Sequence, residues 1–195
     1  MNAWFCRANG ETSHNEPGSK HFVRGEPPSF PRREFNYRTQ CLEGGFARVG
    51  WPAAGDLRSD NWREVAVRAY GDVMPARWVR NLERFAAIRV GDIVAMPADR
   101  DPYDVHFGVV VPGPHNPSAA VGSSPYYYHY DIEAGDWFEN AHRVPVRWHR
   151  SAVGGWAVEH VRSLGGLWLS GFGCISAARA DLVTLATKAG FELAV

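Results

Sequence analysis

Val90 to Val111, VGDIVAMPADRDPYDVHFGVVV, is the stretch that decides the fold. A Gly-Asp turn signal precedes the apolar run Ile93 to Met96, which has the length and the β-branched content of a strand. Pro97 to Asp104 is rich in Pro, Asp and Arg and cannot continue a strand ladder, so we expect a polar loop there. Apolar residues at alternate positions from Val105 to Val111 predict a second, half-buried strand.

The segments on either side of this stretch predict more strands and several helices. Strands are indicated by alternating apolar residues or by aromatic content, and helices by apolar residues at i, i+3, i+4 and i+7. The further strands are expected at Ala3–Ala8, Phe46–Val49, Tyr126–Tyr130, His142–Trp148 and Phe191–Val195, and the helices at Asp60–Tyr70, Pro75–Ile88 and Ser176–Ala189. Short strands with two helices inserted after the second of them indicate an α+β fold, a small curved β-sheet or barrel with flanking helices.

Length and periodicity together predict a single domain over residues 1–195. Residues 11–45 lack periodicity, are rich in Pro and Gly, and exceed an ordinary connection, so we expect an insertion there. Its basic and aromatic side chains are interleaved, which fits either contact with nucleic acid or a solvated loop packed by its own aromatics. From Arg150 the chain is Gly-rich before its last helix, so residues 150–195 are expected to form a C-terminal helical extension.

Charge and composition limit the classes of partner. The chain has 21 basic and 21 acidic residues, and this formal net charge of zero argues against a large, indiscriminate polyanion binder. All the basic residues except Lys20 and Lys188 are arginine, which suits planar recognition of phosphates and bases, although codon composition explains the bias equally well. No apolar run is long enough to span a membrane and no signal peptide is evident, so we expect a cytoplasmic protein.

Motifs for catalysis, cofactors and metals are missing from the sequence. It has no Walker loop, HExxH, EF-hand or GxSxG pattern. Its three cysteines are an odd number without short spacing, so they predict neither a disulfide framework nor a zinc site. We therefore expect no cofactor and no metal, and the sequence gives catalysis no positive support.

Aromatic side chains in loops are the feature that points to a ligand. Trp51 lies in a Gly-Trp-Pro turn and Tyr103 in the hairpin loop. Two such rings can bracket a single extruded base, with Asn9 near the first strand supplying hydrogen bonds to its polar edge. Tyr128 and Trp137 are further candidates for base binding, although core packing explains Tyr128 as well. The candidates for holding the flanking phosphates are Arg7, Arg48, Arg143 and Arg147.

The order of these short pieces resembles a known superfamily. A strand ending in RANG, a later FARVGW turn, then RVGDIVAMP, HFGVVV and HRVPVRW are similar to the PUA-like superfamily, and most of all to its EVE and YTH branches. The likeness covers about Ala3 to Trp148. It implies a small barrel with helices that reads a flipped, often methylated base in an aromatic cage. In that resemblance Trp51 and Tyr103 match the two cage aromatics, and Asn9 matches a polar residue after the first strand.

Three functions stay open at this point. The resemblance implies a non-catalytic reader of a modified DNA or RNA base, serving phage defence or restriction with a separate effector nuclease. A second interpretation is an RNA-cleaving enzyme similar to ASCH-like members of the superfamily, with His106, His129 and Tyr103 as candidate acid–base groups. A third is a protein-interaction module whose exposed aromatics bind a partner.

Overall fold

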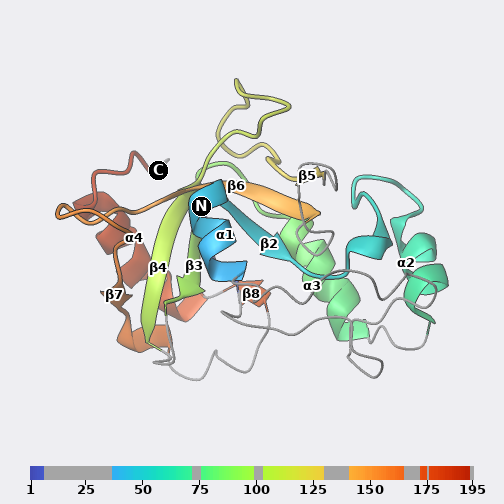
Figure 1. The fold of residues 1–195 in the computed structure, drawn as a ribbon, viewed down its shortest axis with the longest axis horizontal. Helices are drawn as coiled ribbons and strands as arrows, with labels where there is room; N and C mark the ends of the chain where they lie inside the picture. The colour runs from blue at the N-terminus through green and yellow to red at the C-terminus, as the bar shows by residue number, and fades with distance from the viewer. Residues whose placement is uncertain are drawn as a thin grey trace.

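The computed structural model describes residues 1–6, 37–71, 76–98, 103–129, 141–164, 172–174 and 176–193. Its strands are β1 (Ala3–Cys6), β2 (Phe46–Val49), β3 (Ile93–Pro97), β4 (Asp104–Val110), β5 (Tyr127–Tyr128), β6 (His142–Trp148), β7 (Glu159–His160) and β8 (Phe172–Cys174). Its helices are α1 (Tyr37–Gly44), α2 (Trp62–Tyr70), α3 (Ala76–Ala86) and α4 (Arg179–Lys188), with short 3-10 turns η1 (Pro52–Ala54), η4 (Arg162–Leu164) and η6 (Ser176–Ala178). The fold is α+β, with a curled, half-barrel sheet of mixed direction and helices around it (Figure 1).

The sheet is built around the hairpin that the central stretch predicts. The strand order is β2-β6-β4-β3-β1-β8, with β5 added beside β6 and β7 beside β4. β3 and β4 pair antiparallel, with Ile93 opposite Val109 and Pro97 opposite Val105. β1 runs parallel to β3 and antiparallel to β8. β1, β6 and β7 therefore pair directly with this hairpin, and β8, β2 and β5 extend the sheet through β1 and β6.

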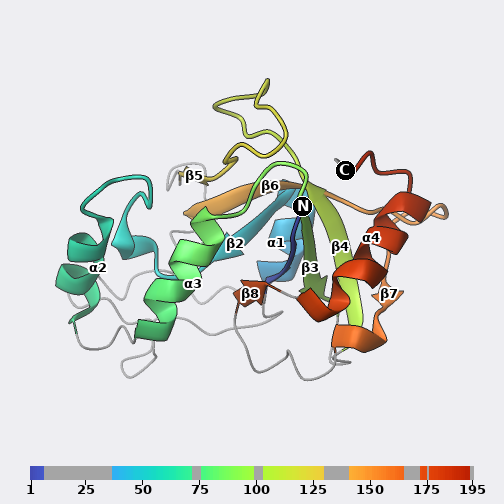
Figure 2. The same ribbon diagram turned by 180° about the vertical axis from the view of Figure 1, so that it is seen from behind.

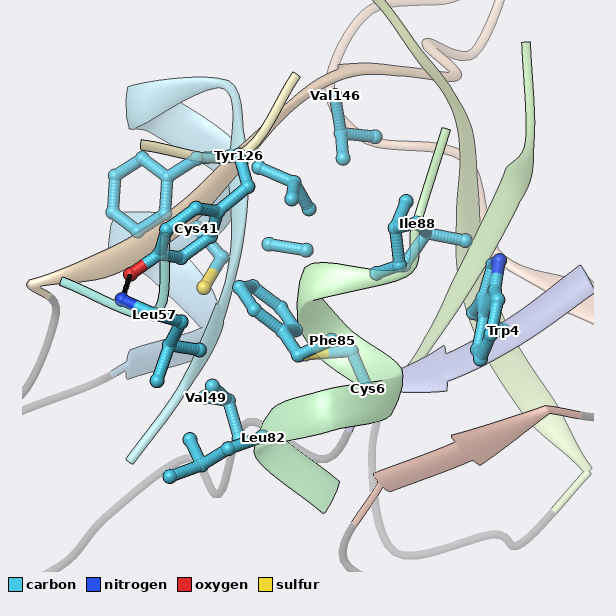
Figure 3. Packing of buried hydrophobic residues seen from close by; sticks show 14 of the residues in the cluster. Trp4, Cys6, Cys41, Val49, Leu57, Leu82, Phe85, Ile88, Tyr126 and Val146 are labelled. Atoms are coloured by element: carbon cyan, nitrogen blue, oxygen red, sulfur yellow. Dashed lines mark hydrogen bonds between the residues drawn. The ribbon is translucent and has the colours of Figure 1, made fainter. Parts of the chain in front are cut away.

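Two hydrophobic cores lie on opposite faces of the sheet. The larger, which we call the central core, joins the sheet to α1, α2 and α3, and Figure 3 shows part of its packing. The smaller, the α4 core, joins the other face of β1, β3 and β4 to α4 (Figure 2). The strand expected from Val105 forms, but Val105 to Val110 are all buried, so the expectation that it is half-buried is wrong. Both faces of β4 are covered, and a strand of alternating sequence is then buried throughout.

Most of the predicted elements form, with exceptions at the ends of the chain. The predicted strand Phe46–Val49 has those bounds, and the two middle helices begin one or two residues later than expected. The strand expected at 191–195 is wrong, because residues 191–193 form no strand and the last two residues lie outside the described ranges. Helix α1 falls within the expected insertion, and β7 and β8 fall within the expected helical extension.

Asp92 ties the start of β3 to the N-terminal segment. The residue is 2% exposed, and its carboxylate accepts hydrogen bonds from the backbone N–H of Asn2 at 2.6 Å, the indole N–H of Trp4 at 2.8 Å and the backbone N–H of Arg89 at 3.0 Å. A buried carboxylate is stable only when such donors replace water. The Gly-Asp turn signal therefore also fixes the parallel pairing of β1 with β3.

Within the described ranges, none of the helices has the length and apolar character that crossing a bilayer requires.

Candidate nucleic-acid interface

Trp51 lies in a turn between β2 and η1, but its ring belongs to the central core. The residue is 3% exposed, and its ring meets Tyr70 of α2 edge-on at 4.8 Å and Trp78 of α3 at 5.4 Å. Its backbone φ of 72° is in the left-handed region, which is unusual for a bulky residue. Packing against two helices covers the ring, so Trp51 presents no open surface on which a base could stack.

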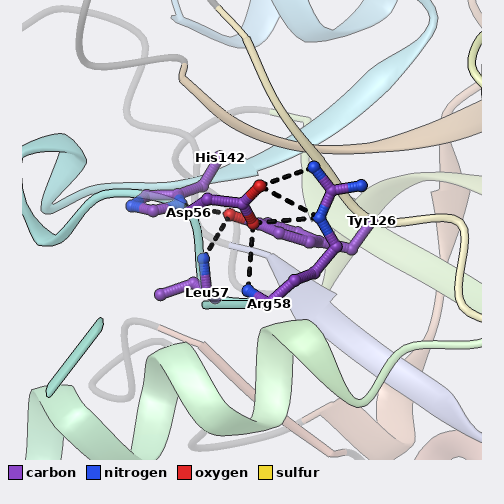
Figure 4. A network of polar contacts seen from close by, with 5 residues as sticks. All are labelled: Asp56, Leu57, Arg58, Tyr126 and His142. Carbon is purple, nitrogen blue, oxygen red and sulfur yellow. Dashed lines mark hydrogen bonds and ion pairs between the residues drawn. The ribbon is translucent and has the colours of Figure 1, made fainter. Parts of the chain in front are cut away.

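A buried chain of hydrogen bonds holds this turn in place, and Figure 4 shows its members His142, Tyr126 and Leu57. His142, fully buried, donates from Nε2 to the Trp51 carbonyl at 3.0 Å and accepts at Nδ1 from the Tyr126 hydroxyl at 2.9 Å. That hydroxyl accepts from the Leu57 backbone N–H at 3.2 Å. Burial lowers the pKa of His142 to about 4, because the charged imidazolium would lose its hydration. The ring is therefore neutral at pH 7, and its role here is structural.

Tyr128 belongs to the same supporting network. Its hydroxyl donates to the Pro52 carbonyl at 3.0 Å, and its ring centroid lies 5.2 Å from that of His142. Beside it, the Ala53 backbone N–H donates to the Tyr70 hydroxyl at 2.8 Å. The contacts of Tyr128 thus favour the core-packing interpretation over base binding.

Tyr103 lies far from Trp51. Its ring centroid is 5.5 Å from that of His160 on β7, and its carbonyl accepts from the Val161 backbone N–H at 2.8 Å. β7 and α2, which carry the ring partners of Tyr103 and Trp51, lie at opposite ends of the molecule in both views (Figures 1 and 2). The expected cage of Trp51 and Tyr103 is therefore wrong, because the two rings lie in different parts of the structure and one is buried.

Three other predicted residues cannot be placed. Arg7, Asn9 and Trp137 lie outside the described ranges. Their expected roles in phosphate and base binding stay predictions.

Three of the predicted phosphate-binding arginines do lie on one face of the sheet. β6 alternates, with Val144 and Val146 in the central core, which puts Arg143 and Arg147 on its opposite face. Arg48 of β2 is the direct cross-strand partner of Arg143. We call Arg48, Arg143 and Arg147 the arginine row.

The members of the arginine row differ in exposure. Arg147 is exposed, Arg48 is half-buried, and Arg143 is 8% exposed. Arg143 thus lies on the expected face of the strand, but it is buried there and does not reach into solvent as expected. The Arg143 guanidinium lies over the Phe46 ring at 4.7 Å. Tyr127 of β5 is the cross-strand partner of Arg143 on the other side, and His115 packs edge-on against it at 5.7 Å. Sequence reasoning missed Tyr127, although the YYYHY alternation that places Tyr128 inward also places Tyr127 with the arginines.

The three candidate acid–base residues of the RNA-cleaving alternative, His106, His129 and Tyr103, do not form one cluster. His106 is 7% exposed and its Nδ1 lies 2.8 Å from the Ala157 carbonyl, and burial lowers its pKa. His129 is exposed and directly follows β5, and its backbone N–H donates to the carbonyl of Ala141, the residue before β6. Tyr103 instead neighbours His160, whose Nδ1 is 2.9 Å from the Asp104 carboxylate. That pair is 56 residues apart in sequence and is brought together by β4–β7 pairing, so no local motif predicts it.

No metal centre is evident in the part of the chain that the structure describes, where no three His, Cys, Asp or Glu side chains form a group able to hold an ion.

Comparison of the chain with protein-family models, with curated proteins and with solved structures found no match.

Proposed function

We propose that this protein binds nucleic acid through the face of the sheet that carries the arginine row. The observation behind the proposal is the pairing of Arg48 with Arg143 across two neighbouring strands. A guanidinium pair suits phosphate oxygens because each group offers several N–H donors in one plane.

The neighbours of this pair favour nucleic acid over a small anion. Arg147 extends the positive charge four positions along β6, which is about 13 Å at the usual rise of a strand. Tyr127 flanks Arg143 on the opposite side from Arg48. A line of guanidinium groups with an aromatic ring beside it is the combination that holds a sugar–phosphate backbone together with its bases.

The zero net charge predicts a restricted footprint. Binding that depends on three arginines releases few counterions, so the logarithm of affinity should fall against the logarithm of salt concentration with a slope of about −2 to −3. A protein that coats a long polyanion would give a steeper slope. Preference for a modified base, a separate effector nuclease and membership of the PUA-like superfamily stay predictions, and the proposal does not depend on the cage that was expected.

Fluorescence anisotropy with labelled DNA and RNA oligonucleotides, plain and carrying modified bases, tests this function. We expect binding that weakens with salt and a loss of about tenfold in Arg147→Gln, the order of one charged hydrogen-bonded contact. The matched control is Arg84→Gln, which removes the same charge from an exposed position of α3. Equal affinity of parent and Arg147→Gln for every oligonucleotide, or no binding by the parent, would show that the arginine row is not a nucleic-acid interface.

A further inference from the structure

We infer that the preferred partner is a single-stranded nucleic acid whose unpaired bases stack on arginine–aromatic pairs along β6 and just beyond it. The inference rests on the proposed function and names its substrate class. Three arginines in this segment each lie over an aromatic ring. These pairs are Arg143 over Phe46 at 4.7 Å, Arg147 over Phe191 at 5.0 Å and Arg150 over Trp156 at 3.9 Å.

The outer two pairs are accessible from solvent. Arg147 and Arg150 are exposed, while Phe191 and Trp156 are half-buried. A guanidinium that lies over a ring uses one of its two flat sides, and its other side is a planar cation of the kind on which bases stack. The ring beneath also limits the rotation of the arginine side chain. Less conformational entropy is then lost when a base arrives.

The Arg150–Trp156 pair is held at the base of a short hairpin. The two residues form an isolated antiparallel bridge, and the loop between them is closed by hydrogen bonds from the Ser151 N–H to the Gly155 carbonyl and from the Gly154 N–H to the Ser151 carbonyl. The two glycines have φ of 97° and 77°, which the tight turn requires. This loop projects at the end of the molecule away from α2 (Figure 2). The pair is thus set in place by backbone structure just beyond β6, on the side of the sheet where Trp156 packs against the central core.

Stacking on these pairs selects unpaired bases. In a duplex, both faces of each internal base are covered by neighbouring bases, so an arginine plane cannot reach them without unstacking. A single strand presents its base faces freely, so bases can stack on the exposed arginine of each pair, Arg147 on the side of the α4 core and Arg150 on the side of the central core. Backbone contacts alone would not distinguish the two forms. We therefore expect discrimination by strandedness, with modest dependence on base sequence.

Anisotropy titrations with a 12-nucleotide single strand and its duplex, made in both DNA and RNA, test the inference at several salt concentrations. The key variant is Arg150→Lys, which keeps the charge but removes the flat group, and Arg147→Lys repeats the test at the second pair. Arg84→Lys on α3 is the matched control. We expect the parent to prefer the single strand at least tenfold. We also expect each of the two β6-segment variants to lose about fivefold or more in single-strand affinity, the order of one stacked base, with an unchanged salt slope.

The outcomes separate the inference from the proposed function. Binding of the duplex as tightly as the single strand, or lysine variants that bind the single strand as the parent does, would overturn the stacking inference and leave nucleic-acid binding intact. Failure of the parent to bind any of the four oligonucleotides would overturn the proposed function itself. If a lysine variant has the same thermal unfolding midpoint as the parent, its loss of single-strand affinity is assigned to the lost stacking contact. If one of the two lysine variants unfolds at a lower temperature than the parent, the other provides the test.

Discussion

Lowering the pH should destabilise this protein through His142, and the size of the effect follows from its surroundings. The pKa of His142 is about 4 in the folded protein, against 6.5 for an exposed histidine. Above pH 6.5 the ring is neutral in both the folded and the unfolded chain, so its contribution to stability is fully present. As the pH falls from 6.5 towards 4, His142 becomes protonated in the unfolded chain but stays neutral in the folded chain. The unfolded chain is stabilised by this proton uptake, so the unfolding free energy falls.

The difference of about 2.5 pKa units corresponds to about 3 kcal/mol of unfolding free energy, at about 1.4 kcal/mol per unit. By pH 4.5 between 2 and 3 kcal/mol, roughly, should be lost. The main structural cause is burial of the ring, which strips the charged imidazolium of its hydration, and a protonated Nδ1 also cannot accept the hydrogen bond from the Tyr126 hydroxyl. Below pH 4 both states carry the proton, and the loss from this group levels off.

Urea unfolding of the parent and His142→Gln between pH 7.5 and 4.5 measures this effect. The glutamine cannot titrate, so its deficit in stability relative to the parent should shrink by about 2 to 3 kcal/mol over that range. His129→Gln, at an exposed position, is the control and should show no such change. A deficit that stays constant within about 0.5 kcal/mol from pH 7.5 to 4.5 would refute a neutral, desolvated His142. If the glutamine variant does not fold, the NMR titration of His142 in the parent gives the same answer, since its ring should remain neutral down to about pH 5.

The remaining predictions concern packing and binding. Asp92→Ala should lower the unfolding free energy by about 3 kcal/mol or more in urea titrations, because three donors lose a buried acceptor, and a loss below about 1 kcal/mol would contradict that role. Tyr126→Phe should cost about 1 to 3 kcal/mol by the same measurement, since Leu57 N–H and His142 Nδ1 both lose their partner. Gly108→Ala should prevent stable folding, as judged by circular dichroism and soluble yield, because its Cβ would lie 2.5 Å from the Arg147 carbonyl oxygen on the paired strand, and a variant with the thermal midpoint of the parent would refute that clash. Arg147→Gln should weaken nucleic-acid binding in the anisotropy assay while its thermal midpoint shifts by less than about 2 °C, since exposed substitutions change stability little.

The sequence by itself determined the local elements and their type. Alternation predicts β4 and β6, helical spacing predicts α2 and α3, and the glycine at position 190, with φ of 75°, ends the last helix as its type suggests. These features depend on neighbours within a few positions of each other, so a single chain segment carries the information. The alternation of β6 also sets apart the arginines that form the row with Arg48.

Only the tertiary structure decided which side chains are covered and which meet. A Gly-Trp-Pro turn predicts an accessible ring at Trp51, but α2 and α3 pack over it. Tyr103 packs instead against His160 of β7, and β7 lies at the opposite end of the molecule from α2 (Figure 1). Burial and proximity depend on the elements that pack against a residue, and those elements come from distant parts of the chain whose order in the sheet no local pattern encodes.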